Sequence, residues 1–408
     1  MSTFIKIAWR NIARSPARSL ITISAISIGL CSLIFLKGFV NGADQQMAEN
    51  YTGLLIGHIQ IHKKGFQKNM SVEKSLGGLE TIKDALRKTP QTAVFSERVK
   101  DFALISSPEG SAGILLLGVD PVTEKNVSTI HKRVNKGEFL KKGDDDKILI
   151  GAQLSGNLKA EIGDKVVIMS QASDGSVAAA AYEVAGIIET GAEEIDKGLA
   201  IITLKAAQSL LVLNGKVSEI AVKTGSLKEV DAATKILKAK IDQAKFEVLN
   251  WKEISPQVYQ WLQFDAVFTN LILFIVLLVV ATGILNTILM AVLERTREFG
   301  IMLALGTRPG QIVFTVAAES FFLGLIGTFT GALLGTLLVI FFGANGIDLS
   351  VISNALNTLY YDSIIYPRSG WIDIAIYSLI VLTVSITISI IPALKASRLS
   401  PIEAIRHI

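Results

Sequence analysis

The stretch that decides the fold is residues 294–306, which read E-R-T-R-E-F-G-I-M-L-A-L-G. It lies between two apolar runs, each long enough to cross a bilayer, and four of its first five residues are charged. Phe299, Met302 and Leu303 follow an i, i+3, i+4 spacing, which predicts a short helix with an apolar ridge beside its charges. Such a helix is suited to lie in the groove of a partner protein. The alternative is an ordinary charged loop that follows the positive-inside rule.

Two residues mark the end of this short helix. Gly306 can close it in a left-handed conformation, and Pro309 suits the first turn of the next helix. We therefore expect a coupling segment, residues 294–310, between two membrane spans.

The composition is that of a membrane protein. Half of the 408 residues are apolar and 19% are charged, against about a quarter in soluble domains. The net charge of +4 is small and no basic patch with interleaved aromatic residues occurs, so we expect no nucleic-acid partner. The only cysteine, Cys31, lies inside an apolar run, where it can form no internal disulfide and is expected to be a packing thiol.

Four apolar runs reach the length of about 20 residues that a membrane helix needs. We expect spans at residues 19–40, 264–293, 311–343 and 370–394. Residues 1–18 form a basic amphipathic helix, suited to the membrane surface, before the first span. A cleavable signal peptide is the alternative. Against it, the apolar run here is longer than the about 7–15 residues usual for a signal peptide, and further spans follow it in this chain.

Charge predicts the orientation in the membrane. The basic clusters are Arg10, Arg14 and Arg18; Arg295, Arg297 and Arg308; and Lys395, Arg398 and Arg406. All three fall on one side, which the positive-inside rule makes the cytoplasm. Both termini are then cytoplasmic, residues 395–408 form a cytoplasmic helix, and residues 41–263 and the loop 344–369 lie outside.

Residues 41–263 have the pattern of an α+β domain. The expected strands are residues 59–61, 94–105, 114–119 and 217–222, and the expected helices are residues 79–86 and 230–241. Short strands with Gly-Asp and Gly-rich turns between residues 147 and 188 predict a small inserted barrel or sandwich. The fold class is thus an α-helical membrane protein with four transmembrane helices and a large α+β extracytoplasmic domain, an α/β part with an inserted β-rich subdomain.

The third span carries glycines at a packing spacing. Gly327, Gly331 and Gly335 form G-x-x-x-G-x-x-x-G, and Gly324 precedes them. In lipid, close backbone approach supplies the attraction between helices. We expect a packing seam rather than the general glycine usage of membrane helices, and the sequence leaves open whether it faces its own chain or a partner.

Glu319 is an intramembrane polar residue in the same span. A carboxylate at the centre of a membrane helix costs about 2.5–3.5 kcal/mol on insertion scales, and less near an interface. Glu319 should therefore face protein or water. A proton relay has no support from a second intramembrane acid at a matching spacing.

The chain lacks common catalytic signatures. No G-x-x-x-x-G-K-[ST] motif occurs, and H-E-x-x-H and G-x-S-x-G are also absent, so we expect a non-catalytic chain without a bound cofactor. His58 and His62 would share one face of a strand, but a metal site needs further ligands. We expect two surface histidines and no metal.

The segment 294–306 resembles the coupling-helix signature of the FtsX-like permease domain, found in the MacB, LolC and LolE family of ABC transporters. Residues 392–404, P-A-L-K-A-S-R-L-S-P-I-E-A, are similar to the usual ending of that domain. The element order in residues 41–263 resembles the family's periplasmic domain. With these parts the resemblance covers nearly the whole chain, and the family often carries an acid at the position of Glu319, which implies a structural or coupling role.

In that family the coupling helix docks on an ATPase and passes its closing motion to the membrane part. The docking residues that the resemblance implies are Glu294, Arg295, Arg297, Glu298, Phe299, Gly300, Met302, Leu303 and Gly306. Glu298 is expected to pair with a base on the ATPase, and Gly300 to let backbones come close. MacB-type proteins fuse their ATPase ahead of the first span, whereas here a separate ATPase is expected.

The resemblance implies a permease subunit in the bacterial inner membrane. We expect a homodimer or heterodimer with two copies of an ABC ATPase that carries the ATP and Mg²⁺. Its substrate would be a lipoprotein or other amphiphile, taken from the outer face of the membrane and passed to a possible periplasmic carrier. The alternatives are MacB-like efflux of peptides, toxins or drugs through an outer-membrane partner, and FtsX-like transmission of motion to a cell-wall hydrolase.

Overall fold

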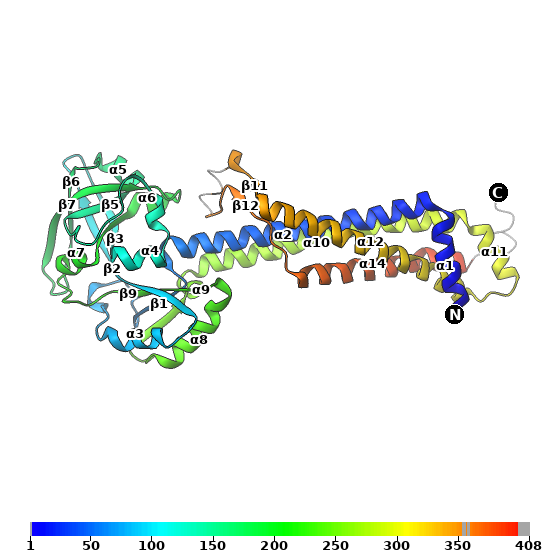
Figure 1. Cartoon of the computed structure of the whole chain (residues 1–408), viewed down its shortest axis with the longest axis horizontal. Coiled ribbons are helices and arrows are strands. Elements are labelled where there is room, and N and C mark those ends of the chain that lie inside the picture. The colour runs from blue at the N-terminus through cyan, green and yellow to red at the C-terminus, as the bar shows by residue number, and fades with distance from the viewer. Residues whose placement is uncertain (1, 353–355, 357–359, 399–408) are drawn as a thin grey trace. The chain divides into compact units, whose positions relative to one another are not determined.

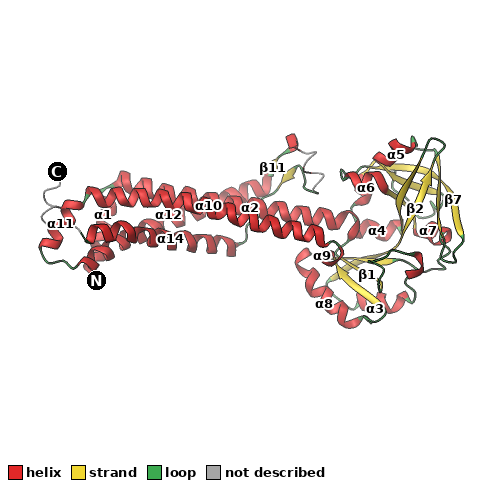
Figure 2. Ribbon diagram, turned by 180° about the vertical axis from the view of Figure 1, so that it is seen from behind, coloured by secondary structure: helices red, strands yellow, loops and turns green. Residues whose placement is uncertain are grey.

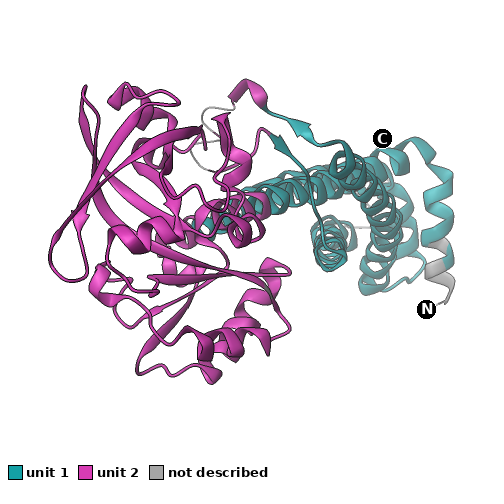
Figure 3. Ribbon diagram, turned by 60° about the vertical axis from the view of Figure 1, so that its left-hand side comes forward, with its two compact units in different colours: residues 1–44, 262–349, 364–408 teal, residues 45–261, 350–363 magenta. Residues whose placement is uncertain are grey.

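The protein divides into two compact units (Figure 3). The computed structural model describes residues 2–352, 356 and 360–398. Unit 1 comprises residues 1–44, 262–349 and 364–408, and unit 2 comprises residues 45–261 and 350–363. The predicted external loop, residues 344–369, is therefore divided between the units. Most of the predicted C-terminal helix, residues 399–408, lies outside the described residues.

Unit 1 is a bundle of helices (Figure 1). Its helices are α1 Ser2–Arg14, α2 Pro16–Tyr51 as far as residue 44, α10 Pro256–Glu294 from residue 262, α11 Thr296–Ala304, α12 Pro309–Asn345 and α14 Trp371–Ser397. Within the described residues, four helices are long and apolar enough to cross a membrane: α2, α10, α12 and α14. They run side by side in unit 1 (Figure 2), and their buried side chains include Ile26, Leu30, Ile284 and Val381.

The segment between α12 and α14 contributes a small antiparallel ladder to unit 1. Strand β11, Ile347–Asp348, pairs with β12, Ile364–Ile365. The chain then passes close to α2, where the Arg368 amide donates to the Gly38 carbonyl at 2.8 Å. A Cβ atom at Gly42 would lie 2.2 Å from the Tyr366 carbonyl oxygen, so only glycine allows this approach.

Unit 2 is built on a ten-stranded sheet with helices around it. The strands are β1 Ile59–Lys63, β2 Thr92–Ser106, β3 Ser111–Val119, β4 Val134–Gly137, β5 Lys147–Gly151, β6 Lys165–Gln171, β7 Val177–Ile188, β8 Leu199–Thr203, β9 Glu219–Thr224 and β10 Phe246–Asn250. The helices are α3 Leu79–Arg87, α4 Pro121–Val127, α5 Ala152–Leu158, α6 Glu193–Gly198, α7 Leu204–Leu210, α8 Val230–Lys240 and α9 Trp251–Ile254.

The strand pairings divide this sheet into an open part and a closed part. Strands β10, β1, β9 and the first half of β2 form an open antiparallel sheet. Strands β2, β3, β8, β5, β7 and β6 pair in that order, and β6 pairs with β2 again, so these strands close into a barrel. The sequence predicted a small barrel or sandwich beginning at residue 147; the structure has a barrel, and it already includes β2 and β3.

Strand β2 belongs to both parts. Residues 92–98 pair with β9 of the open sheet, whereas residues 104–106 pair with β6 of the barrel. Side chains of the second half alternate, so that Val99, Ala103 and Ile105 lie in the barrel core while Phe102 and Leu104 face outward. The chain therefore passes from one part to the other along a single continuous strand.

The prediction of two surface histidines is wrong. His58 and His62 are both buried. Strand β1 lies between β9 and β10. His58 Nδ1 lies 2.7 Å from Thr224 Oγ1 of β9, and His62 Nε2 lies 3.4 Å from Glu219 Oε2 of β9 and 3.0 Å from Gln60 Oε1 of β1 itself. Alternation along β1 could place both rings on one face, but it could not show that this face is covered.

Candidate functional site

The coupling segment, residues 294–310, contains the short helix α11 between two membrane-length helices. A single residue, Arg295, separates the end of α10 from the start of α11. Helix α11 ends in a Schellman-type turn, because Gly306 has a φ of 90° and the Thr307 amide donates to the Met302 carbonyl at 3.0 Å. Arg308 then caps α12. The segment is therefore a helix with defined ends rather than an irregular loop.

Arg295 links α11 to the membrane acid of α12. Its Nη1 donates to Glu319 Oε2 at 2.9 Å, and its Nε donates to Glu298 Oε2 at 3.0 Å. The guanidinium also lies over the ring of Phe299, 5.2 Å from the ring centre. Arg295 and Glu319 are both mostly buried. Glu319 thus faces protein, and pairing with Arg295 offsets the cost of placing a carboxylate in a membrane helix.

The same ionic network reaches the N-terminal helices. Arg14 of α1 donates to Glu298 Oε1 at 3.1 Å, and Arg18 of α2 pairs with Glu294. We define Arg14, Arg295, Glu298 and Glu319 as the coupling network. Glu298, which the sequence suggested as a partner for a base on the ATPase, already has two arginine partners in its own chain.

The apolar ridge of α11 packs into unit 1 instead of facing outward. Phe299 and Gly300 are buried, and Met302 and Leu303 pack against the same core. The apolar side chains that remain exposed are Ile301 at 44% and Leu305 at 82%. The i, i+3, i+4 spacing located a real ridge, but the bundle of α2, α10, α12 and α14 uses it for its own packing.

A second stripe on α11 is available to a partner. Arg297, Ile301 and Leu305 are spaced i, i+4, i+8 and are all exposed, so they lie along one side of the helix. Arg297 makes no ion pair within the described residues. We call Arg297, Ile301 and Leu305 the docking stripe. Ile301 and Leu305 are not among the docking residues expected from the sequence, although their spacing from Arg297 indicates a shared side of the helix.

Helix α1 is fixed to the bundle close to the coupling segment. Trp9 packs edge-to-face on Phe322 of α12 with ring centres 5.5 Å apart. Ser19 Oγ of α2 donates to the Ile12 carbonyl of α1 at 2.9 Å. The basic helix α1 is therefore joined to both α2 and α12 as well as to Glu298.

The glycine seam of α12 faces α2 of the same chain. A Cβ atom at Gly331 would lie 2.7 Å from the Ser27 carbonyl oxygen, and one at Gly327 would lie 2.7 Å from Ile26 Cβ. Gly335 meets Ile34 and Cys31 of α2, whereas Gly324 meets Leu382 and Ser385 of α14. The question that the sequence left open is answered: this seam packs within the chain.

A second ionic cluster lies in unit 2, at the end of α2. There a π-helical turn, η1 Thr52–Ile56, follows α2, and the Leu55 carbonyl accepts a hydrogen bond from Arg98 Nη1. Arg98 also donates to Glu124 at 2.7 and 2.9 Å and to Glu219 at 3.1 Å. We define Arg98, Glu124 and Glu219 as the Arg98 cluster; all three side chains are fully buried.

Charge pairing controls the ionisation of this cluster. Burial alone would raise the pKa of Glu219, but Lys100, His62 and Arg98 hold that pKa well below its usual range. Burial likewise opposes ionisation of Glu124, and Arg98 lowers its pKa. Through these contacts Arg98 of β2 is joined to Glu124 of α4, to Glu219 of β9 and to the Leu55 carbonyl of η1. No local sequence pattern predicts this cluster, because the partners of Arg98 lie 26, 43 and 121 positions away.

Two family models match the chain. The MacB-like periplasmic core domain matches residues 19–240, and the FtsX-like permease C-terminal domain matches residues 270–401. This chain belongs to the MacB-like and FtsX-like ABC transporter permeases. The second match includes the coupling segment and the glycine seam, and the first includes the Arg98 cluster.

The permease is similar to named relatives over nearly its whole length. It is 24% identical over 406 residues to the lipoprotein-releasing system transmembrane protein LolC of Neisseria meningitidis serogroup B, covering 95% of this chain and 94% of that protein. It is 25% identical over 412 residues to the macrolide export ATP-binding/permease protein MacB of Nitrobacter winogradskyi, covering 98% of this chain and 59% of MacB. The solved periplasmic region of MacB from Actinobacillus actinomycetemcomitans matches with a TM-score of 0.36 and 13% identity, covering 53% of this chain and 98% of that structure.

These relationships fix the general class of the protein. It is an ABC transporter permease of the inner membrane. Permease subunits of this family are generally non-catalytic and normally work with an ATPase partner.

Proposed function

We propose that this permease couples ATP hydrolysis by a separate ATPase to the extraction or release of a lipoprotein, or another amphiphilic substrate, at the outer face of the inner membrane. The observation that carries the proposal is the coupling segment. Helix α11 is tied to α1 and α12 by ion pairs, while the docking stripe stays exposed. A fixed helix with an exposed apolar stripe is what docking in a partner's groove requires.

The route of the motion follows from the helix connections. Because Arg295 alone separates α11 from α10, a push on α11 acts directly on α10, and the Arg295–Glu319 pair carries it to α12. Helices α2 and α10 are continuous from unit 1 into unit 2. Closing of two ATPases, with ATP and Mg²⁺ bound, would press two coupling segments together and move these long helices.

The assembly we propose contains two permease chains, because four spanning helices are few for a transport unit. The second chain is a copy or a paralogue. Both termini and the coupling segment lie in the cytoplasm and unit 2 lies outside, which follows from the basic clusters. The similarity to the lipoprotein-releasing system protein LolC supports a lipoprotein as substrate. A periplasmic carrier is the acceptor that we propose for it.

Affinity purification of the native complex tests the proposal. The chain is extracted from membranes and its bound proteins are identified by mass spectrometry. We expect an ABC ATPase together with a lipoprotein or a lipoprotein carrier. The reconstituted complex should release lipoprotein from proteoliposomes only with hydrolysable ATP. An outer-membrane duct in place of the carrier would indicate MacB-like efflux, a cell-wall hydrolase would indicate FtsX-like transmission, and absence of any ATPase would contradict the proposal.

Accessibility of single cysteines tests the orientation independently. In a Cys31→Ser background, Lys142→Cys of unit 2 and Arg308→Cys of the coupling segment are both exposed positions. We expect an impermeant maleimide to label only Lys142→Cys in intact spheroplasts, and both variants after permeabilisation. Labelling of Arg308→Cys in intact spheroplasts would contradict the orientation.

A further inference from the structure

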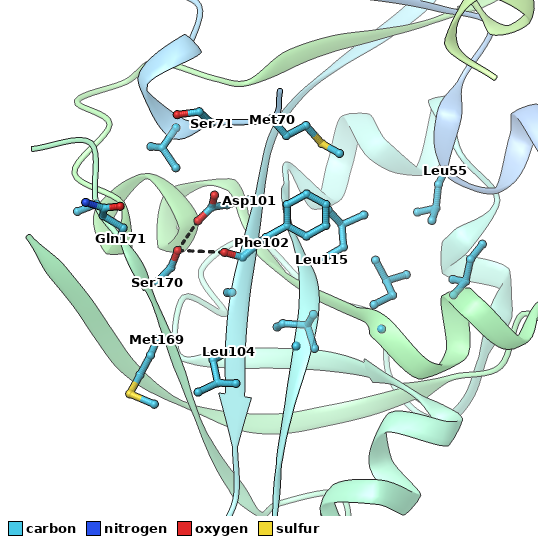
Figure 4. A pocket seen from close by; sticks show the side chains of 18 of the residues that line it. Leu55, Met70, Ser71, Asp101, Phe102, Leu104, Leu115, Met169, Ser170 and Gln171 are labelled. Carbon is cyan, nitrogen blue, oxygen red and sulfur yellow. Dashed lines mark hydrogen bonds between the residues drawn. The ribbon is translucent and has the colours of Figure 1, made fainter. Parts of the chain in front are cut away.

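Unit 2 has an open groove on the outer face of its barrel, with a volume of about 760 Å³ (Figure 4). Phe102 and Leu104 of β2 and Leu115 of β3 line it. Met70, which precedes the short 3-10 turn at residues 72–74, and Met169 of β6 also line it. A volume of this size lies in the range of about 300–1,000 Å³ typical of small-ligand sites.

The apolar side chains of the groove are not needed to build the barrel. Phe102 is 62% exposed and Leu104 is 41% exposed, whereas Ala103 and Ile105 on the opposite face of the strand are buried in the barrel core. An outward-facing strand surface normally carries polar side chains. Adjacent exposed apolar side chains in a concave surface mark an interaction site.

The charges in the lining have one sign. Glu73 and Glu194 are exposed, and Asp101 is largely buried. The described residues that line the groove include no lysine, arginine or histidine. The nearest base along β2, Lys100, is turned to Glu219, which its Nζ contacts at 2.8 Å. The groove therefore combines an apolar surface with two exposed carboxylates, Glu73 and Glu194, while burial raises the pKa of the third acid, Asp101.

Asp101 is held in place at the wall of the groove. Its carboxylate accepts a hydrogen bond from Ser170 Oγ, and Ser170 Oγ also lies 3.3 Å from the Phe102 carbonyl (Figure 4). These contacts join β2 to β6 at the level of Phe102. The carboxylate and the exposed ring therefore have fixed positions relative to each other.

We propose that this groove binds a cationic amphiphile, a molecule with an apolar body and a basic group, as the substrate site of the permease. The apolar body would lie on Phe102 and Leu104, and the basic group would lie near the exposed carboxylates of Glu73 and Glu194. The proposal rests on the proposed function and narrows its substrate class. Anionic amphiphiles are selected against, because no base in the lining offsets the carboxylates.

The groove is also connected to the end of α2. The side chain of Leu55 lines the groove, and the carbonyl of the same residue accepts the hydrogen bond from Arg98. A displacement of η1 would therefore change the groove wall. This connection gives the transporter a route from helix motion to substrate release.

Binding of two fluorescent dyes of opposite charge tests the proposal. The whole chain is placed in lipid nanodiscs without any ATPase, and fluorescence anisotropy is recorded for rhodamine 6G, a cation, and for 8-anilinonaphthalene-1-sulfonate, an anion. Empty nanodiscs give the lipid background. We expect saturable binding of rhodamine 6G above this background and binding of the anion that is weaker by about tenfold or more.

Matched variants locate the site. Phe102→Gln and the pair Glu73→Gln with Glu194→Gln should each weaken rhodamine 6G binding by about tenfold. Val177→Gln and Glu161→Gln, at exposed positions outside the groove, should leave it unchanged. Phe102 and both glutamates are exposed, so these changes leave the fold intact, which circular dichroism of the nanodisc sample verifies.

Each other outcome overturns the proposal. Equal binding to wild type and groove variants would place the dye elsewhere. Tighter binding of the anion would contradict the charge argument. Absence of binding together with self-association that depends on Phe102 would assign the groove to a second copy of the chain. Because no ATPase is present, failure here leaves the coupling proposal standing, and loss of ATPase association would leave this binding result intact.

Discussion

The Arg98 cluster in unit 2 and the Arg14–Glu298 pair in the coupling network of unit 1 differ in how far their charges are exposed to water. The three side chains of the Arg98 cluster in unit 2 are 0% exposed, whereas in the coupling network of unit 1 Arg14 is 74% exposed and Glu298 is 42% exposed. Both networks join elements that are distant in sequence. The buried cluster fixes the turn that follows α2, while the exposed Arg14–Glu298 pair ties α1 to the segment that we propose docks an ATPase.

The surroundings determine what each network can do. A buried ion pair has to be complete, because removing one partner leaves a charge in a medium of low dielectric constant. An exposed pair contributes little to stability, since water solvates its members when they separate. The Arg14–Glu298 pair of the coupling network can therefore open and re-form during a transport cycle at low cost, whereas the mostly buried Arg295–Glu319 pair and the Arg98 cluster cannot.

The largest expected effect is that of Arg98→Met. It leaves Glu124 and Glu219 buried without their arginine and removes the hydrogen bond to the Leu55 carbonyl. We therefore expect the free energy of unfolding of unit 2 to fall by about 3–5 kcal/mol. Thermal unfolding of the whole chain in nanodiscs measures this. Arg87→Met, an exposed arginine of α3 in ion pairs with Glu80 and Asp84, is the matched control. If Arg98→Met lowers the free energy of unfolding by less than about 1 kcal/mol, as expected for an exposed pair, the Arg98 cluster is not essential for the stability of unit 2.

A smaller effect is expected from acid. Burial, assisted by Lys223, lowers the pKa of His58 from 6.5 to about 4. The unfolded chain therefore binds a proton that the folded chain does not, and stability present above pH 6.5 falls as the pH drops toward 4. Over this interval the loss approaches about 3 kcal/mol. Hydrogen exchange of the β1 amides in the whole chain, followed from pH 7 to pH 4.5, measures it.

His58→Gln provides the comparison for this titration. The variant lacks the titrating ring, so exchange of β1 should depend less on pH than in the wild type. An identical pH dependence in both proteins would assign the acid sensitivity to other groups.

The smallest effect on stability is expected for Arg14→Gln. Its pair with Glu298 is exposed, so the cost should stay within about 1 kcal/mol and should shrink in high salt. Thermal unfolding at two salt concentrations measures both. A loss comparable to that of Arg98→Met would erase the distinction between the two networks.

The parts of the fold that sequence predicts are those encoded locally. Length and apolar character located the four long helices, and glycine spacing located the seam on α12. Turn residues indicated the barrel. The seam's partner, α2, could not be read from α12 alone, because that contact joins residues about 300 positions apart, as Ser27 and Gly327 show.

The candidate site shows the same limit. Helical spacing placed the Phe299 ridge on α11, but only the packing of the other helices shows that the ridge is buried and that Ile301 and Leu305 stay exposed. The partners of Glu298 and Glu319 likewise come from other elements. Strand β2 belongs to both the open and the closed part of the sheet, and no pattern along its 15 residues predicts this.

Docking through α11 is measured by the affinity of the purified partner ATPase for the permease in nanodiscs. The variant is Ile301→Asp, in the middle of the docking stripe, and the matched control is Ile301→Leu. If α11 docks through this stripe, the aspartate should weaken ATPase binding by about tenfold or more, and it should lower stimulation of ATP hydrolysis equally, while the leucine changes neither. If a folded Ile301→Asp permease binds the ATPase with wild-type affinity, the ATPase does not dock on this stripe.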